Sequence, residues 1–332
     1  MNDATRDAVT PTVVRIFPTA TNRGDVAMRE LVDAYMAAYA GRDTAMAQRL
    51  GFWVDAIGNV RLRDVDPDLI ADHLDQLAAQ PVRKYIGKDA EGRRLYRAHH
   101  ARSGATVKRY KNAISAVMTW ARKRRLTPKG WRNPAHDVES SPEGPGRTRF
   151  LSKDECDRLL KVARISAWAK LHLLILMAIT TGARRGELLG LRYRDLHLPE
   201  SRDEAGTATL PRTKNGDPRC LPLTPAVCAE VKRHAIGAPA ALLFPGKFRT
   251  EKPYAIEEAW RRCLRLARID GVRFHDLRHT CASYLAQSGA SLLEVADVLG
   301  HRSLAMTKRY AHLTTQSKAK LVQNVLGGIG NA

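Results

Sequence analysis

The sequence predicts a mainly helical protein with a small antiparallel sheet, which is an α+β fold in two domains. Its 332 residues are enough for two domains with separate cores. Apolar residues recur at helical spacing and make up 44% of the chain, as expected of a folded protein. A hairpin interrupts the helices, because the strand-like segments 207–213 and 219–223 flank Asn215-Gly216, a strong hairpin signal.

The domain boundaries follow from local composition. Residues 1–24 are polar, contain two prolines and show no periodicity, so we expect a flexible N-terminal arm. A helical domain is predicted over residues 25–140. Prolines and glycines crowd residues 141–149, which predicts a linker. Residues 150–332 form the second domain, and its last helix is predicted over residues 317–326.

In the first domain, helices are predicted over residues 27–40, after Asp66-Pro67, and over residues 105–125. Residues 81–103 are basic and punctuated by glycine, so we expect a loop there. The helix over residues 105–125 is amphipathic. Its apolar side chains fall on one face: Val107, Tyr110, Ile114, Val117, Met118 and Ala121.

In the second domain, helix boundaries are marked by capping residues. Ser152 with Glu155 and Ser291 with Glu294 have the spacing of capping boxes. Residues 171–180 read as a buried helix that ends at Gly182, and a short helix follows through Leu189. Further boundaries are predicted at Thr224-Pro225, where a helix begins, at Gly289 and Gly300, where helices end, and near Ala255, after which the chain is almost entirely helical.

The formal net charge is +21, from 55 Lys and Arg against 34 Asp and Glu. Such an excess repels itself in a compact protein, so a polyanionic partner explains it most simply. A basic protein that binds anions without specificity would have the same composition. Between Arg93 and Arg132 lie thirteen basic residues and no acidic one, which favours phosphate contact. The candidate DNA-binding residues in this region are Thr106, Lys108, Arg109, Lys111, Arg122 and Arg124.

Cysteine and hydropathy patterns exclude several classes of protein. The five cysteines are widely spaced and include no C-x-x-C pair, which argues against a thiol zinc cluster. No apolar run has the length of a membrane span, and the N-terminus lacks a signal core. His275 and His279 are four residues apart, but no glutamate lies between them as in a zinc-binding H-E-x-x-H helix. We therefore expect a reduced, cytoplasmic protein with no metal and no cofactor.

A few residues of the second domain have the chemistry to act on a phosphodiester. Taken singly, each has an ordinary explanation: Arg184 has the spacing to pair with Glu187, and a lone tyrosine such as Tyr310 is usually a packing residue. Together they supply a nucleophile, positive charge for nonbridging oxygens and groups that move protons. The set is Arg184, His275, Arg278, His301 and Tyr310.

Their order along the chain resembles the tyrosine recombinases, also called phage integrases. Thr181-Gly182-Ala183-Arg184-Arg185-Gly186-Glu187-Leu188 resembles the first conserved box, and His275-Asp276-Leu277-Arg278-His279-Thr280 the second. Leu299-Gly300-His301 followed by Tyr310 resembles the terminal signature. The resemblance extends from about Ser152 to Leu313, and more weakly over residues 106–134. It implies a helical core-binding domain followed by a catalytic domain of the DNA breaking-rejoining fold.

The resemblance also implies a role for each residue. Arg184 and Arg278 would bind the nonbridging oxygens of the scissile phosphate. Tyr310 would attack the phosphorus, which gives a 3′-phosphotyrosyl link and a free 5′-hydroxyl without metal or ATP. The remaining roles are general base for His275, phosphate hydrogen bonding for His301, protonation of the leaving 5′-oxygen for Lys214, and a supporting acidic position for Glu187. Arg212 and Arg219 are basic alternatives to Lys214.

The expected function is site-specific recombination of duplex DNA in the cytoplasm, on the nucleoid. The family acts as a homotetramer on two DNA sites, and a directionality factor is a further candidate partner. The predicted C-terminal helix, with Leu321, Val325 and Leu326 on its apolar side, would dock on a neighbouring subunit or on its own domain. Two other functions fit part of the pattern: a type IB topoisomerase that relaxes supercoils, and a basic DNA-binding protein without catalysis.

Overall fold

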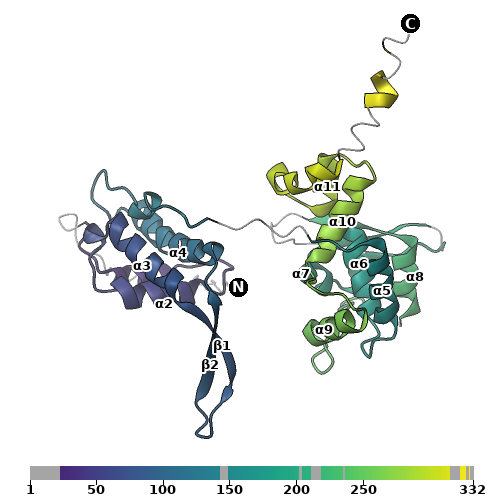
Figure 1. Ribbon diagram of the computed structural model, residues 1–332, viewed down its shortest axis with the longest axis horizontal. Coiled ribbons are helices and arrows are strands. Elements are labelled where there is room, and N and C mark those ends of the chain that lie inside the picture. The colour runs from purple at the N-terminus through teal and green to yellow at the C-terminus, as the bar shows by residue number, and fades with distance from the viewer. Residues whose placement is uncertain are drawn as a thin grey trace, which may run out of the picture. The chain divides into compact units, whose positions relative to one another are not determined.

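The computed structural model describes residues 23–142, 149–201, 204–210, 218–234, 236–314, 322–326 and 329. The chain divides into two compact units, Met1–Gly146 and Arg147–Ala332 (Figure 1). This division falls inside the segment predicted as a linker. Most of the described residues with regular structure are helical, and the strands form small antiparallel sheets. The α+β fold class is therefore confirmed.

The described residues of the first unit form four α-helices, each long enough to bury one face. Asp66 caps its helix as predicted, because its carboxylate accepts a hydrogen bond from the Leu69 amide at 2.7 Å. One helix, over residues 46–57, was not predicted, and Gly51 in its middle hides its helical pattern. The helices are α1 Met28–Ala37, α2 Met46–Ile57, α3 Pro67–Ala79 and α4 Gly104–Lys123, with 3₁₀ turns η2 Leu62–Asp64 and η3 Pro134–His136.

Helix α4 is the centre of this unit, since it packs against α1, α2 and α3. Its predicted apolar stripe is confirmed, because Val107, Ile114 and Met118 are buried. The Trp53 side chain from α2 is fully buried, and its indole N–H donates to the Tyr110 carbonyl at 2.9 Å. The core therefore holds α4 in place by one face and leaves its other face toward solvent.

The prediction of a loop over residues 81–103 is wrong. The chain forms two antiparallel strands there, β1 Pro81–Lys88 and β2 Arg94–Ala101, which extend away from the helices (Figure 1). Val82, Tyr85 and Ile86 in β1 and Tyr96 in β2 favour this structure. At the turn, Asp89 Oδ1 accepts hydrogen bonds from the amides of Glu91 and Arg93, and Gly92 adopts a φ of +78°.

The second unit contains a three-stranded antiparallel sheet, in the order β3-β4-β5, beside a group of helices. The predicted hairpin is present as β4 Gly206–Leu210 and β5 Arg219–Leu223, while its predicted turn at Asn215-Gly216 lies outside the described residues. The short strand β3 Leu196–His197 was not predicted. The helices are α5 Lys153–Arg164, α6 Leu171–Thr181, α7 Arg185–Leu189, α8 Pro225–Arg233, α9 Glu257–Leu266, α10 Asp276–Gln287 and α11 Leu292–Leu299, with the 3₁₀ turns η4 Tyr193–Asp195, η5 Leu304–Met306 and η6 Lys308–Thr314.

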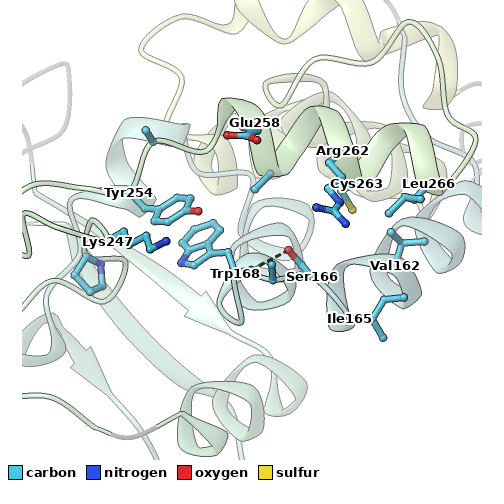
Figure 2. Close-up of a pocket in the computed structure, with 14 residues that line it drawn as sticks. Val162, Ile165, Ser166, Trp168, Lys247, Tyr254, Glu258, Arg262, Cys263 and Leu266 are labelled. Carbon is cyan, nitrogen blue, oxygen red and sulfur yellow. Dashed lines mark hydrogen bonds between the residues drawn. The ribbon is translucent and has the colours of Figure 1, made fainter.

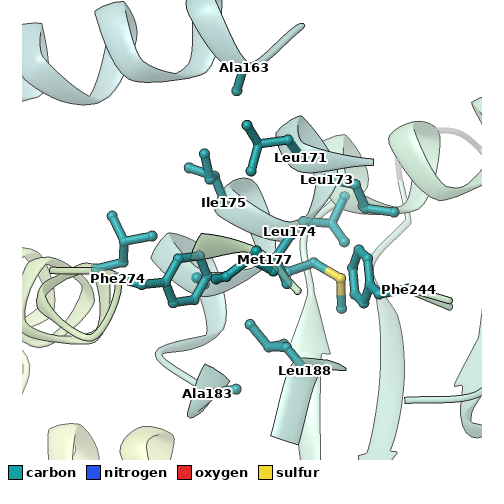
Figure 3. Packing of buried hydrophobic residues seen from close by; sticks show 14 of the residues in the cluster. Ala163, Leu171, Leu173, Leu174, Ile175, Met177, Ala183, Leu188, Phe244 and Phe274 are labelled. Atoms are coloured by element: carbon teal, nitrogen blue, oxygen red, sulfur yellow. The ribbon is translucent and has the colours of Figure 1, made fainter. Parts of the chain in front are cut away.

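Helix α6 runs through the core of this unit. It packs against α5, α8, α10 and β5, and most of its residues are buried, as its sequence predicted. Figure 3 shows Leu174 and Met177 of α6 beside Phe244, with Leu173 and Leu188 nearby. Because α6 is held on several sides, the turn at its C-terminal end has a fixed position.

The predicted helix caps are confirmed. Ser152 with Glu155 and Ser291 with Glu294 each form a capping box, and the Thr224 hydroxyl accepts from the Val227 amide at 3.4 Å. Near the C-terminus the structure differs from the prediction in one respect: Tyr310 lies on the 3₁₀ turn η6 instead of an α-helix. Residues 322–326 are helical, within the predicted C-terminal helix.

Candidate active site

The site begins at the turn that follows α6. Gly182 has a φ of +60°, a left-handed conformation that glycine adopts without strain. A Cβ atom at this position would lie 2.5 Å from the Leu299 side chain, so a larger residue would force that side chain to move. The Gly182 carbonyl accepts a hydrogen bond from Arg278 Nη1 at 2.6 Å. The turn therefore positions one of the predicted catalytic arginines.

Arg184 lies two residues after Gly182, at the N-cap position of the short helix α7. Glu187 accepts from the Arg184 amide at 2.8 Å and from Arg184 Nη1 at 2.7 Å. The pairing with Glu187 that the spacing allowed is thus formed. The Arg184 side chain remains 20% exposed, and the Glu187 side chain only 7%. Glu187 orients the guanidinium while part of it stays accessible to a ligand.

Arg219 is a third arginine at this place, which the sequence offered only as an alternative to Lys214. Its Nη1 lies 3.8 Å from Glu187 Oε2, and its Nη2 donates to the Val298 carbonyl. The Arg219 side chain also lies against Gly300, where a Cβ atom would come within 2.9 Å of it. Arg219 therefore links β5 to the end of α11. In the sequence, the one sign that Arg219 belongs to the site was its position as the first residue of the second hairpin strand.

The charges at this site are unbalanced. Arg184 and Arg219 pair with the carboxylate of Glu187, and Arg278 lies close enough for all three charges to act on it. Burial, followed by the nearby charges of Arg184 and Arg219, lowers the pKa of Arg278 to about 10, so it stays protonated at neutral pH. Arg278 Nη2 is buried and has no hydrogen-bond partner among the described residues. Because a buried charged donor without an acceptor is costly, this cluster is suited to an anion.

Three histidines surround the arginines. Burial is the main cause that lowers the pKa of each, and nearby positive charges add to it in each case. The pKa falls to about 4 for His279 and about 4 for His301, so both imidazoles are neutral at pH 7. The rings of His275 and His279 lie edge to face, with centroids 5.4 Å apart. His301 Nδ1 is 2.8 Å from the Thr307 hydroxyl, which fixes its ring.

Tyr310 is buried, with only 5% of its surface exposed, and packs among residues of α10 and α11. Its hydroxyl lies 2.5 Å from His279 Nδ1. Burial raises the pKa of Tyr310, and the charges of Arg309 and Arg278 oppose this effect. A neutral His279 with its proton on Nε2 accepts this hydrogen bond from the phenol. From the sequence, His279 was a candidate only for metal binding with His275. The spacing between His279 and Tyr310 gave no sign that the two side chains meet.

The structure thus brings most of the predicted residues into one neighbourhood. Arg184, Glu187 and Arg278 surround the turn after α6, and the charges of Arg184 and Arg278 act on both His275 and His301. Lys214 and Arg212 lie outside the described residues, so the role of Lys214 stays a prediction.

The predicted DNA-binding residues of α4 are not all on its outer face. Arg109 and Arg122 are exposed, and Arg124 stacks over the Trp120 ring at 5.5 Å. Lys111, a predicted DNA-binding residue, does not lie on the outer face, because its side chain is buried and its ammonium donates to the Val138 carbonyl and to the Ser140 hydroxyl. The Thr106 hydroxyl lies 3.0 Å from that of Ser103, at the start of the helix, and Lys108 is partly exposed.

A separate cavity of about 530 Å³ lies between α5 and α9. Trp168 and Tyr254 stack in parallel at its wall, with ring centroids 3.9 Å apart, and Glu258 and Arg262 line its other side (Figure 2). None of the predicted catalytic residues lines this cavity. The described residues contain no cluster of three potential metal ligands, and none of their helices is both long and apolar enough to cross a membrane.

Comparison with known proteins gives consistent results. A family model described as the phage integrase family matches residues 149–317, just over half of the chain. A shufflon-specific DNA recombinase of Escherichia coli is 33% identical over 182 residues, which are 54% of this chain and 44% of that protein. Tyrosine recombinase XerD of Caulobacter vibrioides is 29% identical over 239 residues, which are 67% of this chain and 75% of that protein.

Among solved structures, the Tn1549 transposon integrase in complex with a circular intermediate DNA is similar in fold. The TM-score is 0.63 at 17% sequence identity, and the match covers 90% of this chain and 99% of that one. The family model covers the turn after α6, the arginine cluster and the segment that holds Tyr310. The chain therefore belongs to the phage integrase family, the family of the tyrosine recombinases.

Proposed function

We propose that this protein is a site-specific recombinase that cuts and rejoins duplex DNA through a covalent bond to Tyr310. The observation that carries the proposal is the arginine cluster: Arg184 and Arg219 share the carboxylate of Glu187, and a buried nitrogen of the neighbouring Arg278 has no hydrogen-bond partner among the described residues. A phosphodiester supplies the missing acceptor, and the fixed charges stabilise the negative charge that develops on its nonbridging oxygens.

The reaction is a transesterification. The Tyr310 oxygen forms a bond to the phosphorus, the bond from phosphorus to the 5′-oxygen breaks, and the phenolic proton passes to a base. The leaving 5′-oxygen takes a proton, a role we assign to Lys214. The phosphotyrosyl bond replaces a phosphodiester of similar energy, so the reverse attack by a 5′-hydroxyl rejoins the strand without ATP. Arg184 and Arg278 supply the positive charge that a metal ion provides in other phosphoryl-transfer enzymes.

We propose a different role for each of the three histidines. His275 is proposed as the general base, because its pKa is lowered and it is neutral at physiological pH. His301 is proposed to donate a hydrogen bond to the phosphate from Nε2, since its Nδ1 is engaged by Thr307. His279 contacts the nucleophile directly, so we propose that it positions Tyr310 and prevents the phenol from packing elsewhere.

The outer face of α4 is proposed to bind the DNA backbone. Lys108, Arg109 and Arg122 place positive charge along it, Arg124 adds a charge at its C-terminal cap, and the Thr106 hydroxyl lies at its N-terminal end. A shallow groove of about 430 Å³ runs along the same helix, lined by Asn112, Ser115, Ala116, Thr119, Trp120 and Lys123. Small polar side chains at spacings of three and four residues suit contact with a groove of duplex DNA.

The active assembly is proposed to be a homotetramer on two DNA sites in the nucleoid, with a directionality factor as an additional partner. The C-terminal segment supports an association between copies. Val325, Leu326 and Ile329 are 66%, 50% and 78% exposed, so these apolar side chains are not packed on their own domain. We propose that they dock on a neighbouring subunit. Leu321 lies outside the described residues.

The experiment that tests the function is capture of protein-linked DNA from cells that express the protein together with candidate host DNA. Sequencing of the attachment points distinguishes the three functions. A discrete attachment sequence supports a site-specific recombinase. Scattered attachment points would instead indicate a topoisomerase of type IB. Absence of adducts, also on a nicked trapping duplex of the correct site, would leave only a DNA-binding protein.

A further inference from the structure

The β1–β2 hairpin, residues 81–101, is not explained by the catalytic chemistry. Its two strands contact each other far more than they contact any other described element. Every residue of β2 is exposed, and Tyr85 and Tyr96 are 50% and 49% exposed. An isolated two-stranded hairpin is only marginally stable in water. A ribbon of this kind, about 25 Å long from the rise per residue, therefore suits a surface outside the protein.

The pairing of side chains in the hairpin is unfavourable without a ligand. Lys84 lies opposite Arg97, and Lys88 lies opposite Arg94. Like charges directly across two strands destabilise a hairpin. No ion pair of these four side chains with an acidic residue is found within the described part of the chain. Both acidic residues of the hairpin lie at its turn and pair with Arg93. A polyanion would remove this repulsion.

The charges are placed on both faces of the ribbon. Tyr85 pairs with Tyr96, and their rings lie 5.9 Å apart in an edge-to-face arrangement. Alternation along β2 puts Arg94 on the same face as Tyr96 and Arg97 on the opposite face. Cations on both faces of a narrow ribbon can meet the phosphates on both sides of a DNA groove, and the major groove admits a two-stranded ribbon.

Both ends of the ribbon are fixed. At its base, Arg102 Nη1 donates to the carbonyls of Gln80 and Leu77, at 2.8 and 3.2 Å. At the tip, Asp89 orders the turn through its bonds to the Glu91 and Arg93 amides. Ser103 then caps α4 immediately after the hairpin. The ribbon thus continues the basic surface of α4 as a preformed extension.

We propose that the β1–β2 hairpin is a second DNA-binding element, which enters a groove of duplex DNA next to the segment bound by α4. The inference rests on the proposed function, because it takes duplex DNA as the partner. It adds an extended contact, separate from the arginine cluster, that enlarges the bound DNA segment and strengthens binding through phosphates.

The test uses the full chain and a fluorescently labelled random-sequence duplex, with the dissociation constant measured over a range of NaCl concentrations. The variant carries Lys84→Gln, Lys88→Gln, Arg94→Gln and Arg97→Gln. Loss of four phosphate contacts lowers the slope of log affinity against log salt by about 3 to 4. A matched control removes the same number of charges from the end of α9 through Arg261→Gln, Arg262→Gln, Arg265→Gln and Arg268→Gln.

A smaller slope in the hairpin variant alone supports the proposal. Equal slopes in the wild type and the hairpin variant would overturn it, as would equal decreases in the hairpin variant and the control. Loss of binding to phosphatidylserine vesicles with an unchanged DNA slope would assign the hairpin to a membrane surface instead. Circular dichroism and thermal melting establish that the variants are folded. A second variant, Tyr85→Ser with Tyr96→Ser, changes the exposed ribbon without loss of charge. We expect it to bind DNA more weakly than the wild type. These measurements need no cleavage, so they stand apart from any failure to form a covalent adduct.

Discussion

At the scale of single residues, Arg278 shows how burial prepares a group for one ligand. Its side chain is held by the Gly182 carbonyl at one nitrogen and lacks a partner at another. Lysine at this position would keep the charge but lose the planar fork that binds two oxygens. We expect Arg278→Lys to slow covalent adduct formation about 100- to 1,000-fold, because transition-state charge is stabilised less well.

DNA affinity should change little in the Arg278→Lys variant, since the basic surface of the first unit is intact. The matched control is Arg185→Gln, an exposed arginine that pairs with Glu257 at 2.8 Å. Single-turnover cleavage and DNA titration of both variants make the measurement. Full cleavage activity in Arg278→Lys would remove this residue from the phosphate site.

His279 gives a prediction about pH. Its pKa is about 4 in the folded protein, and the ordinary value of 6.5 applies when the chain is unfolded. Between these values the unfolded chain binds more protons, so the stability is complete above about pH 6.5 and decreases as the pH falls toward 4. When the pH is lowered from about 7 to about 5, the melting temperature of His279→Gln should therefore fall less than that of the wild type. His301 contributes in the same direction and remains in the variant.

The same His279→Gln variant tests its role in positioning Tyr310. Glutamine can still bond to the phenol, so slow cleavage in His279→Ala that is partly restored in His279→Gln is the expected result. Scanning fluorimetry and single-turnover cleavage are the two measurements. Identical pH dependence of melting in wild type and variant, together with unchanged cleavage, would show that the contact between His279 and Tyr310 has no consequence.

At the scale of elements, the turn after α6 connects the fold to the chemistry. Gly182→Ala places a Cβ atom 2.5 Å from Leu299 in a left-handed conformation. We expect the second unit to be destabilised by about 2 kcal/mol and cleavage to fall with it, because the carbonyl that holds Arg278 moves. Gly186→Ala in α7 is the matched control, since nothing lies within 4 Å of its Cβ position. Equal stability of the two variants in denaturant titration would contradict this account of the turn.

Helix α4 gives an element-scale prediction about DNA binding. Arg109→Gln with Arg122→Gln should lower the slope of log DNA affinity against log salt concentration by about 2. Lys111→Met should leave the slope unchanged and alter stability instead, because the Lys111 ammonium is bound to Val138 inside the protein. Titration with labelled duplex at several salt concentrations measures both. A slope change in Lys111→Met as large as in the arginine pair would mean that Lys111 turns outward to bind DNA.

Much of the local structure could be predicted because its signals lie close together in sequence. The capping boxes at Ser152 and Ser291 and the glycine stop at Gly182 each depend on a few neighbouring residues. Strands β1 and β2 were missed because polar and apolar residues do not alternate in them, and every position of β2 faces solvent. Without a buried face, a strand leaves no periodic pattern in the sequence.

The candidate site shows the same limit. The order of Arg184, Arg278 and Tyr310 was visible in the sequence, whereas the contacts of Arg219 and His279 depend on residues far away along the chain. Arg219 reaches Val298, and His279 reaches Tyr310 across 31 positions. Lys111 was proposed to bind DNA because of its charge, but its neighbours one turn away on α4, Val107 and Ile114, are buried, and the return of the chain at Val138 gives its ammonium a partner inside.

At the scale of the whole molecule, each unit provides a separate part of the proposed function. The first unit offers a basic helix and a charged ribbon, both without catalytic groups. The second unit holds the arginine cluster, the neutral histidines and the sheltered nucleophile. The first unit would then determine DNA affinity and the second unit DNA cleavage. Substitutions in the first unit should therefore leave the cleavage step largely unchanged, and substitutions in the second should leave DNA affinity largely unchanged. The proposed transfer of a strand between two DNA sites requires several copies, and the exposed C-terminal apolar residues offer a contact between them.

Tyr310 is proposed to form the bond to DNA. The most direct measurement is mass spectrometry of tryptic peptides from captured adducts of the wild type, of Tyr310→Phe and of Tyr284→Phe. Tyr284 is a suitable control because its hydroxyl donates to the Leu151 carbonyl and has no place in the chemistry. We predict a nucleotide on the peptide containing Tyr310 in the wild type and in Tyr284→Phe, and no adduct in Tyr310→Phe. An adduct of undiminished yield in Tyr310→Phe would show that another residue forms the bond to DNA.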